Sequence, residues 1–314
     1  MDFRVGLTGA TGFAGSFVLQ ELLAAGHQVK ALVRRPRDFE GAVTSILGSL
    51  DEPATLAPLV QDVDVVIHVA GAISTINDNY YFRVNFAGTK ALYEAALAAG
   101  VKRFVFVSSL AARAPEVSAY AASKRAAEDF LTSRHDGIEI LILRPSAVYG
   151  PGDKATLPLI RALQSRVAIV PGRAGMRFSL VHVTDLAQVI AAAASRDETG
   201  LFEIDDGSGG YDWAALAAAS FAITGKPSKL IFMPKSVALG GAFAIECFAA
   251  LNGGAAMANR GKVRELYQPD WVVRGRAWPG QKFRSLEQGL METLHWYWQA
   301  GWLKPPGQKV RSAA

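Results

Sequence analysis

The sequence contains very little cysteine and no cluster of metal-binding side chains. Cys247 is the only cysteine among 314 residues, which excludes an internal disulfide and favours a reducing compartment. The five histidines are widely separated and none has a ligand-like partner nearby in the sequence, so we expect no metal site. The N-terminal segment MDFRVGLTGATG enters a predicted strand at once, without a signal-peptide pattern. These features predict a cytoplasmic protein.

A strong charge of one sign is also lacking. The chain has 33 Lys and Arg residues against 28 Asp and Glu residues, for a net charge of +5, and the basic residues are scattered. No basic stripe with interleaved aromatic residues is present, which argues against nucleic acid as a partner. A small-molecule substrate is the expected partner.

No apolar run is long enough to span a bilayer, which takes about 20 residues. The most apolar stretch of the second half is SVALGGAFAIECFAAL, residues 236–251, and we expect it to form a helix packed in a core. The alternatives are that one face of this helix lines an apolar substrate pocket or contacts a membrane surface. Nearby basic residues that would suit anionic lipid are Lys235, Arg260, Lys262 and Arg264.

Apolar residues are abundant, and they follow an alternating pattern of strands and helices. Half of the residues are hydrophobic, and over residues 1–143 short β-branched runs alternate with Ala- and Leu-rich helical stretches. Continuous apolar strands joined by helices predict a parallel sheet covered on both faces. We therefore expect an α/β protein, with a doubly wound parallel-sheet Rossmann fold and a smaller, mostly helical C-terminal substrate lobe.

The pattern is less regular in the second half. Residues 153–178 are expected to form a helix and a loop, FSLVHV a core strand, TDLAQVIAAAAS a helix capped by Thr184, and LFEID a strand. From about residue 226 the chain is expected to be mostly helical, with a last helix capped at Ser285. The predicted division is a nucleotide-binding core of residues 1–148, completed by about 179–204, and an interleaved substrate-binding lobe within 149–314.

A glycine-rich turn lies between the first predicted strand and the first predicted helix. The segment runs Thr8-Gly9-Ala10-Thr11-Gly12-Phe13-Ala14-Gly15, and this context favours a dinucleotide site over a simple turn. Gly9 permits the tight turn, Gly12 allows a pyrophosphate to approach the backbone, and Gly15 lets helix and strand pack closely. The phosphates would then lie at the helix N-terminus.

Arg34 and Arg35 follow the second predicted strand, where an NAD-specific site would carry an acidic residue for the ribose 2′-hydroxyl. An arginine suits a 2′-phosphate instead. The sequence therefore favours NADP(H), with NAD(H) as the alternative if both arginines are only solvated charges.

Tyr120 and Lys124 stand four residues apart in AYAASKRAAE. On a helix this spacing puts the phenol and the ammonium on one face, where the positive charge lowers the pKa of the tyrosine. Such a tyrosine can exchange a proton while hydride moves to or from a nicotinamide. The pair alone is weak evidence, but it follows the glycine-rich turn and the strand-like RFVFVSS in the order that this chemistry needs.

Together these motifs resemble the extended branch of the short-chain dehydrogenase/reductase superfamily. The resemblance covers nearly the whole chain, in the order TGATGFAG, HVAG, VNFAGTKAL, FVFVSS, YAASK, RPSAVYGPGD, FSLVHVTDLA and GLMETLHWYWQAGWL. The second half is more similar to 3β-hydroxysteroid dehydrogenases and dihydroflavonol reductases than to nucleotide-sugar epimerases, chiefly through RGKVRELYQPDWVV.

The resemblance implies a role for each matching residue. Tyr120 would be the acid/base, Lys124 would lower its pKa and hold the nicotinamide ribose, and Ser109 would bind the substrate oxygen, with Ser108 as the alternative. Asn85 would support the lysine through water, or else only mark a helix kink. The residues implied to line the cofactor site are Gly9, Thr11, Gly12, Phe13, Gly15, Arg34, Leu50, Val69, Ala70, Gly71, Tyr120, Lys124, Pro145 and Val148.

Two departures from the family pattern concern the cleft. Ser49 stands in GSL where the family often has an aspartate near the adenine. The loop between Ser109 and Tyr120 is short, so either substrate selectivity is loose or the second lobe supplies a lid.

Three functions fit these residues. The favoured one is an NADP(H)-dependent oxidoreductase that interconverts a carbonyl and a secondary alcohol on an apolar small molecule. The others are a nucleotide-sugar epimerase or dehydratase with retained NAD, and a non-catalytic cofactor-binding assembly subunit. By analogy with the branch, a homodimer would form through the helices at 79–99 and 118–134.

Overall fold

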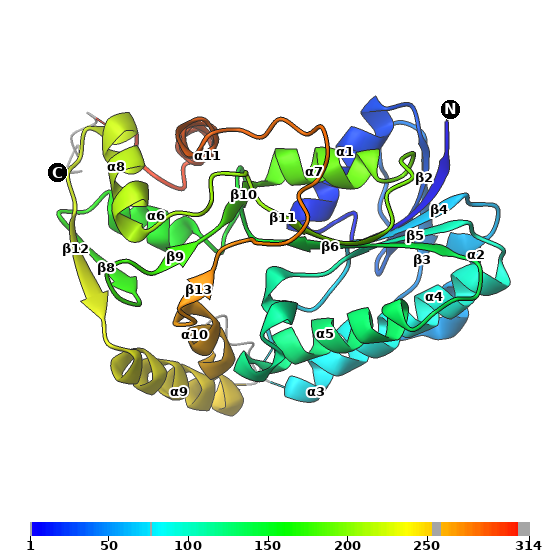
Figure 1. Cartoon of the computed structure of the whole chain (residues 1–314), viewed down its shortest axis with the longest axis horizontal. Coiled ribbons are helices and arrows are strands. Elements are labelled where there is room, and N and C mark those ends of the chain that lie inside the picture. The colour runs from blue at the N-terminus through cyan, green and yellow to red at the C-terminus, as the bar shows by residue number, and fades with distance from the viewer. Residues whose placement is uncertain (1, 76, 253–258, 307–314) are drawn as a thin grey trace.

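The computed structural model describes residues 2–75, 77–252 and 259–306, with the backbone alone for 247–252. Its centre is a seven-stranded parallel sheet of order β11-β6-β5-β4-β1-β2-β3 (Figure 1). The strands are β1 Arg4–Thr8, β2 Gln28–Val33, β3 Val43–Leu47, β4 Val65–His68, β5 Arg103–Val107, β6 Glu139–Pro145 and β11 Gly200–Ile204. The predicted Rossmann-like α/β fold is confirmed.

Helices cover both faces of the sheet because its central strands are apolar throughout. All the residues of β4 and β5 are buried. Helices α1 (Phe13–Ala24) and α7 (Val183–Ala192) pack together on one face, while α2 (Ala57–Val60), α4 (Gly88–Ala98) and α5 (Ala119–Thr132) cover the other (Figure 1). Each face therefore has its own apolar layer.

Short helical turns occur where the chain leaves the strands. They are the 3₁₀ turns η1 (Pro53–Thr55), η3 (Leu110–Arg113) and η4 (Pro115–Val117), the helix α3 (Asp78–Tyr81) and a π-helical turn over Phe82–Ala87 that runs on into α4. The strand order reverses between β1 and β4. In open α/β sheets the carboxyl ends of the strands at such a reversal form the ligand crevice.

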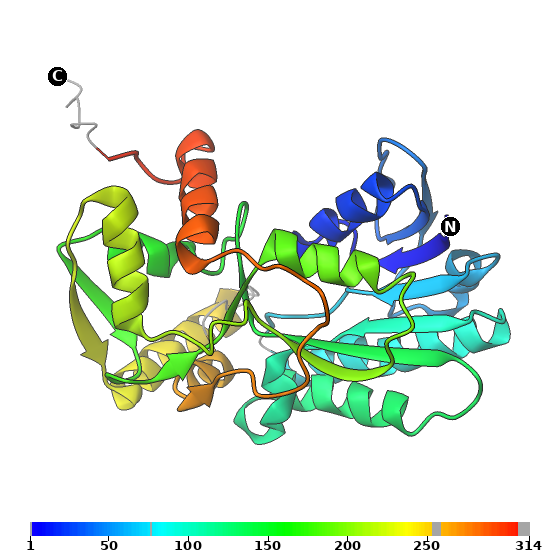
Figure 2. The same ribbon diagram turned by 45° about the horizontal axis from the view of Figure 1, so that its top comes forward.

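A second lobe lies beside the sheet (Figure 2). Its helices are α6 Leu157–Leu163, α8 Trp213–Thr224, α9 Lys235–Asn252, α10 Arg260–Leu266 and α11 Leu286–Gln299. Three two-stranded parallel sheets connect them: β7 (Ala147–Tyr149) with β10 (Leu180–His182), β8 (Val167–Pro171) with β12 (Lys229–Met233), and β9 (Arg177–Phe178) with β13 (Asp270–Trp271).

Several expectations for this half need correction. Strands β8 and β12 are additional to the expected elements, whereas the core strand expected in FSLVHV is present as the buried β10, which pairs with β7. The cap of α7 is His182, whose Nδ1 accepts from the backbone N–H of Thr184 at 3.4 Å, so Thr184 itself is not the cap. The cap at Ser285 is confirmed, with a full capping box to Gln288.

Helix α9 contains the apolar run but is not the core helix that was expected. Of its described side chains only Ala242 is buried, whereas Val237, Phe243 and Ile245 are about half exposed or more. The side chain of Cys247 lies outside the described residues. Within the described ranges, no helix has the length and apolar character needed to cross a bilayer.

Candidate functional site

The glycine-rich turn connects β1 to α1 at the strand-order reversal. Gly9 has φ +83°, and a Cβ there would lie 2.7 Å from the backbone nitrogen of Ala70, so only glycine fits. A Cβ on Gly15 would overlap the carbonyl oxygen of Gly9. Gly12 caps α1 without a side-chain hydrogen bond, which leaves first-turn N–H groups for an anion. The turn is thus shaped for close backbone approach to a phosphate.

A buried hydrogen-bond chain holds the ends of β1 and β4 beside this turn. The Ala70 N–H donates to Thr8 Oγ1 at 3.2 Å, and Thr8 Oγ1 lies 2.6 Å from His68 Nδ1. On the other side of the ring, His68 Nε2 lies 2.9 Å from Thr89 Oγ1, which donates to the Asn85 carbonyl at 2.6 Å. These partners assign the Nε2–H tautomer, with Nδ1 accepting from Thr8.

His68 is neutral in this position. Burial, with a smaller effect of the Lys124 charge, lowers its pKa to about 3. The side chain is fully buried, so it acts as an uncharged brace between β1, β4 and α4 rather than as an acid or base.

Of the two serines after β5, only Ser109 is available to Tyr120. Ser108 Oγ donates to Glu128 Oε1 at 2.5 Å, and that carboxylate also receives two hydrogen bonds from Arg144, of 2.9 and 2.6 Å. The Ser109 side chain instead lies near enough to the phenol of Tyr120 to lower the pKa of that phenol, and its Oγ accepts from the backbone N–H of Ala111 at 3.2 Å. The buried Glu128 therefore decides the register that the sequence left open, a role that no local sequence pattern signals.

Lys124 lies beneath the crevice, close to the segment that follows β4. Its Nζ donates to the Val107 carbonyl at 2.9 Å and lies 4.8 Å from the ring centroid of Phe106. A Cβ on Gly71 would lie 3.2 Å from this Nζ, so Gly71 leaves room for the lysine. Burial lowers the pKa of Lys124 to about 8, against the opposing charge of Glu128.

Asn85 holds the chain after β4 against α5 and lies within the π-helical turn. Its Oδ1 accepts from the Ala72 N–H at 2.7 Å, and its Nδ2 donates to the Ala72 carbonyl and to Ser123 Oγ, both at 3.0 Å. The helix irregularity expected as the alternative for Asn85 is present, whereas its support of the lysine through water stays a prediction. Such π-bulges are frequent at functional sites.

A second lysine, Lys262 of the other lobe, lies near the side chain of Tyr120. Burial outweighs the other effects and raises the pKa of Tyr120, while the nearby Ser109 side chain and the charge of Lys262 lower it. The expected lowering by Lys124 is not found, because Lys124 is not among the groups that shift this pKa. Lys262 Nζ lies 6.0 Å from the Tyr120 ring centroid and 2.9 Å from Glu265, which accepts from Ser118 Oγ at 2.5 Å. Lys262 had been grouped with surface cations, and only its place in the folded lobe reveals this contact.

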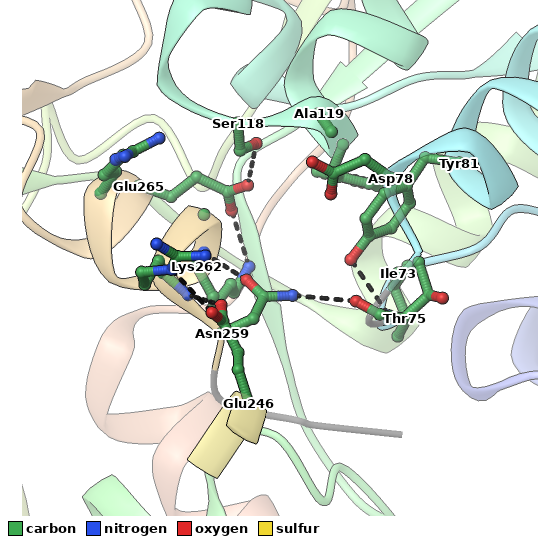
Figure 3. Close-up of a pocket in the computed structure, with 14 residues that line it drawn as sticks. Ile73, Thr75, Asp78, Tyr81, Ser118, Ala119, Glu246, Asn259, Lys262 and Glu265 are labelled. Carbon is green, nitrogen blue, oxygen red and sulfur yellow. Dashed lines mark hydrogen bonds and ion pairs between the residues drawn. The ribbon is translucent and has the colours of Figure 1, made fainter. Parts of the chain in front are cut away.

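A cavity of about 220 Å³ opens at Tyr120 between α3, α5, α9 and α10 (Figure 3). Its lining includes Ile73, Tyr81 and Tyr120, but most of it is polar: Thr75, Asp78, Ser118, Glu246, Asn259, Arg260, Lys262, Arg264 and Glu265. Of the described part of the apolar run, only Glu246 lines this cavity. The cavity thus suits the polar part of a ligand, which differs from the apolar pocket that was one alternative.

The second lobe closes over the short loop that follows Ser109. Arg113, in that loop, donates to the carbonyls of Asp270 and Val272 at 2.9 and 2.8 Å. Asn259 Nδ2 donates to the Thr75 carbonyl at 3.2 Å. These contacts support the lid alternative.

The other residues expected at the cofactor lie at or after the carboxyl ends of strands, or in the glycine-rich turn. Arg34 is exposed at the end of β2, and Leu50 is buried near Gly88. Val69 and Ala70 continue from β4, while Thr11 and Phe13 lie in the turn. Pro145 ends β6 and Val148 lies in β7. Between them the buried Ser146 hydroxyl finds no partner among the described residues, which leaves it free for a bound group.

Comparison with known proteins gives consistent matches. A sequence profile described as "NAD dependent epimerase/dehydratase family" matches residues 5–204. A ceramide reductase of Caulobacter vibrioides is 37% identical over 310 residues, 95% of this chain and 96% of that protein. A putative dihydroflavonol 4-reductase of Synechocystis is 28% identical over 331 residues, 95% of each chain.

Among solved structures, the Bordetella bronchiseptica enzyme WbmH in complex with NAD+ superposes with a TM-score of 0.73 at 19% identity, covering 95% of this chain and 99% of that one. The Thermus thermophilus UDP-glucose 4-epimerase with NAD gives 0.68 at 20%, covering 94% and 98%. At this identity the likeness concerns the fold.

Proposed function

The chain belongs to the NAD-dependent epimerase/dehydratase family, of the extended short-chain dehydrogenase/reductase type, and we propose that it reduces a ketone on a lipid-like amphiphile with NADP(H). It is an oxidoreductase that binds a nicotinamide dinucleotide. The observation that carries the proposal is that Tyr120, whose pKa the nearby Ser109 side chain lowers, lines a small polar cavity.

In the proposed reaction the chain's residues bind and protonate the carbonyl oxygen. The bound nicotinamide supplies hydride when the carbonyl is reduced. Ser109 holds the carbonyl oxygen beside the Tyr120 phenol, and Tyr120 Oη gives it a proton. Lys124, beside Gly71, would hold the ribose, and the charge of Lys262 favours the phenolate that remains. Asn85 keeps the segment after β4 in place for that contact.

The residues present fit the cofactor. The Gly9 and Gly15 positions admit no side chain, and the first turn of α1 lacks a side-chain cap, as a pyrophosphate site requires. We assign Arg34 to the adenosine ribose of the cofactor. An arginine there, in place of an acidic residue, favours a 2′-phosphate and hence NADP(H). Leu50, Val69, Ala70, Pro145 and Val148 would line the rest of the cofactor.

The size and polarity of the cavity support an amphiphilic substrate. Its volume of about 220 Å³ is below the range of roughly 300–1,000 Å³ that encloses a whole drug-sized ligand. It would therefore hold the head of a longer molecule, with its hydroxyl or amide groups against Asn259 and Ser118. The relative named ceramide reductase supports the same substrate class.

The experiment has two parts. Mass spectrometry of the cofactor released from purified protein is expected to show exchangeable NADP(H). Turnover is then measured on long-chain ketones, including a ceramide carrying a ketone, and on UDP- and dTDP-sugars. Retained NAD with turnover of nucleotide sugars would instead support the epimerase, and bound cofactor without turnover the assembly subunit.

Two structural expectations also remain proposals. The division into residues 1–148 with 179–204 and the lobe within 149–314 is tested by limited proteolysis. A homodimer through α4 and α5 is tested by the mass of the protein in solution.

A further inference from the structure

The two-stranded sheet of β8 and β12 carries apolar side chains on its exposed face as well as on its buried face. Ala168 and Val170 point inward, fully buried in a cluster with Trp213. On the outward face Ile169 and Ile231 are direct partners in the register, with 54% and 46% of their surfaces exposed, and Val167 is 45% exposed. A sheet with one solvated face normally alternates apolar with polar residues, whereas Lys229, the partner of Val167, is the one polar residue that the two described strands place on this outward face.

The exposed apolar surface continues into α9. The helix begins at Lys235, two residues after β12 ends, and Val237 in its first turn is 60% exposed. We call the side chains of Val167, Ile169, Ile231 and Val237 the β8–β12 face. Single exposed apolar residues are ordinary. Here the cross-strand pair of Ile169 and Ile231 is exposed, and so are Val167 in β8 and Val237 in the helix that follows β12.

The two segments of the chain that contain β8 and β12 carry charges of one sign. No acidic residue lies between Asp153 and Asp185, a segment with Lys154, Arg161, Arg166, Arg173 and Arg177. None lies between Asp212 and Glu246 either, a segment with Lys226, Lys229 and Lys235. The net charge of the whole chain does not reveal that these two segments are basic. The pairing of β8 with β12 brings them together.

Four of these cations are free to act on a partner. Arg166, Lys226, Lys229 and Lys235 are exposed, and within the described ranges none forms an ion pair. Exposed cations beside exposed aliphatic side chains match an anionic lipid surface, where the aliphatic groups enter the headgroup boundary and the cations meet phosphates.

We propose that the β8–β12 face docks the protein on the surface of a bilayer that contains anionic lipid. A second copy of this chain fits the face less well, because a two-fold contact would bring the same cations together.

The docked face leads toward the site. Helix α9 starts at the β8–β12 face, and its Glu246 lines the cavity at Tyr120 (Figure 3). The eleven steps from Lys235 to Glu246 span about 17 Å at 1.5 Å per residue. A lipid-like substrate could then reach the cavity from the membrane side of α9, a step that rests on the proposed function, whereas docking itself does not.

The test uses flotation of the full chain with vesicles of phosphatidylcholine alone or with about one third phosphatidylglycerol. Binding is expected only with phosphatidylglycerol, and it should decrease as salt is raised. Lys229→Glu and Lys235→Glu should each weaken partitioning roughly fivefold or more. Ile231→Glu and Val237→Glu should also weaken partitioning, because each removes an exposed apolar side chain and adds a negative charge that the anionic lipid repels.

Matched controls come from the sheet lobe. Leu47→Glu replaces a residue of β3 that is 60% exposed, and Lys90→Glu reverses a half-exposed cation on α4; both should float like the parent. Melting temperature and turnover of a soluble short-chain ketone show that each variant is folded.

The docking proposal is overturned if the parent does not float with phosphatidylglycerol, or if the control variants lose binding equally. A change of oligomeric mass in Ile231→Glu without any effect on flotation would assign the face to self-association. Flotation without ketone turnover would leave docking in place and remove the proposed substrate. Turnover of soluble ketones without flotation would leave the proposed reaction in place and overturn docking.

Discussion

Lys262 of α10 lies over the ring of Tyr120 of α5, with its Nζ atom 6.0 Å from the ring centroid. The C-terminal lobe thereby places a positive charge near the proposed acid/base, in addition to Lys124 on the same helix as the tyrosine. Its partner Glu265 also accepts from Ser118, the N-cap of α5. The position of the lobe and the ionisation of Tyr120 are therefore linked.

Lys262→Met should raise the pKa of Tyr120, because it removes a charge that lowers it. Burial alone would lower the pKa of Lys262, but Glu265 outweighs it and keeps the lysine charged. Because the Lys262 side chain is 51% exposed, water screens the effect, and we expect only a roughly three- to tenfold loss of kcat for alcohol oxidation near neutral pH.

The pH profile separates this role from a structural one. In Lys262→Met the acidic limb of the kcat profile for alcohol oxidation, where the rate rises as Tyr120 is deprotonated, should move to higher pH, with recovery of the rate there, whereas Lys262→Arg should resemble the parent. Lys282→Met, which removes an exposed cation of the same lobe, is the control. An unshifted profile in Lys262→Met would show that the lysine does not act on Tyr120.

Ser109→Ala and Ser108→Ala should have different consequences. Ser109→Ala removes the hydroxyl beside Tyr120 and should lower kcat by roughly 10- to 100-fold. The lost 3.2 Å bond from the Ala111 N–H should cost no more than about 1 kcal/mol of unfolding free energy. Ser108→Ala removes a donor to the buried Glu128 and should cost about 1–3 kcal/mol of unfolding free energy, with a smaller kinetic effect. Steady-state rates and urea unfolding are measured for both variants. A larger kinetic loss in Ser108→Ala and a larger loss of stability in Ser109→Ala would exchange the roles assigned to the two serines.

Tyr120→Phe should keep cofactor affinity and lower turnover by roughly 10²- to 10⁴-fold, since it removes the proton donor but keeps the ring. Cofactor binding is followed by nicotinamide fluorescence, and turnover on any substrate that the parent accepts. Parent-like rates would remove Tyr120 from the mechanism.

Arg34→Asp should weaken NADPH far more than NADH, because it replaces the proposed partner of the 2′-phosphate with a like charge. The ratio of the two dissociation constants is the measurement. Arg37→Asp, a nearby exposed arginine, is the control. An unchanged ratio in Arg34→Asp would contradict the NADP(H) assignment.

The sheet and the glycine-rich turn were predictable because their signals are local. Each apolar strand, each helix and the spacing around Gly9 can be recognised within a few residues. Strands β8 and β12 could not be found this way, since each becomes a strand by pairing with a segment far along the chain. The exposure of α9 could not be predicted, because an apolar run in the sequence does not show whether other elements pack against it.

Within the site, the sequence supplied the residue types but not their environment. Two adjacent serines look equivalent until Glu128 binds one of them. Lys262 has no motif of its own, because its contact with Tyr120 exists only when α10 packs beside α5. His182 was overlooked as a cap because histidine is a rare capping residue, whereas the adjacent Thr184 is a common type.

His68 predicts a pH dependence of stability. Burial lowers its pKa from 6.5 to about 3 in the folded protein, so between these values the unfolded chain binds a proton that the folded protein does not. Unfolding is therefore favoured as pH falls below 6.5, by up to about 1.4 kcal/mol per pH unit from this residue. Above pH 6.5 both states are neutral at His68 and the effect vanishes.

His68→Gln should remove this contribution, since an amide can bond Thr8 and Thr89 but does not titrate. Urea unfolding from about pH 7.5 to about pH 5 should then show a shallower loss of unfolding free energy in the variant than in the parent. His135→Gln, at an exposed position outside the core, is the control and should retain the parent's slope. Parallel curves for parent and His68→Gln would mean that His68 is protonated in the folded protein, which would contradict the hydrogen-bond chain from Thr8 to Thr89.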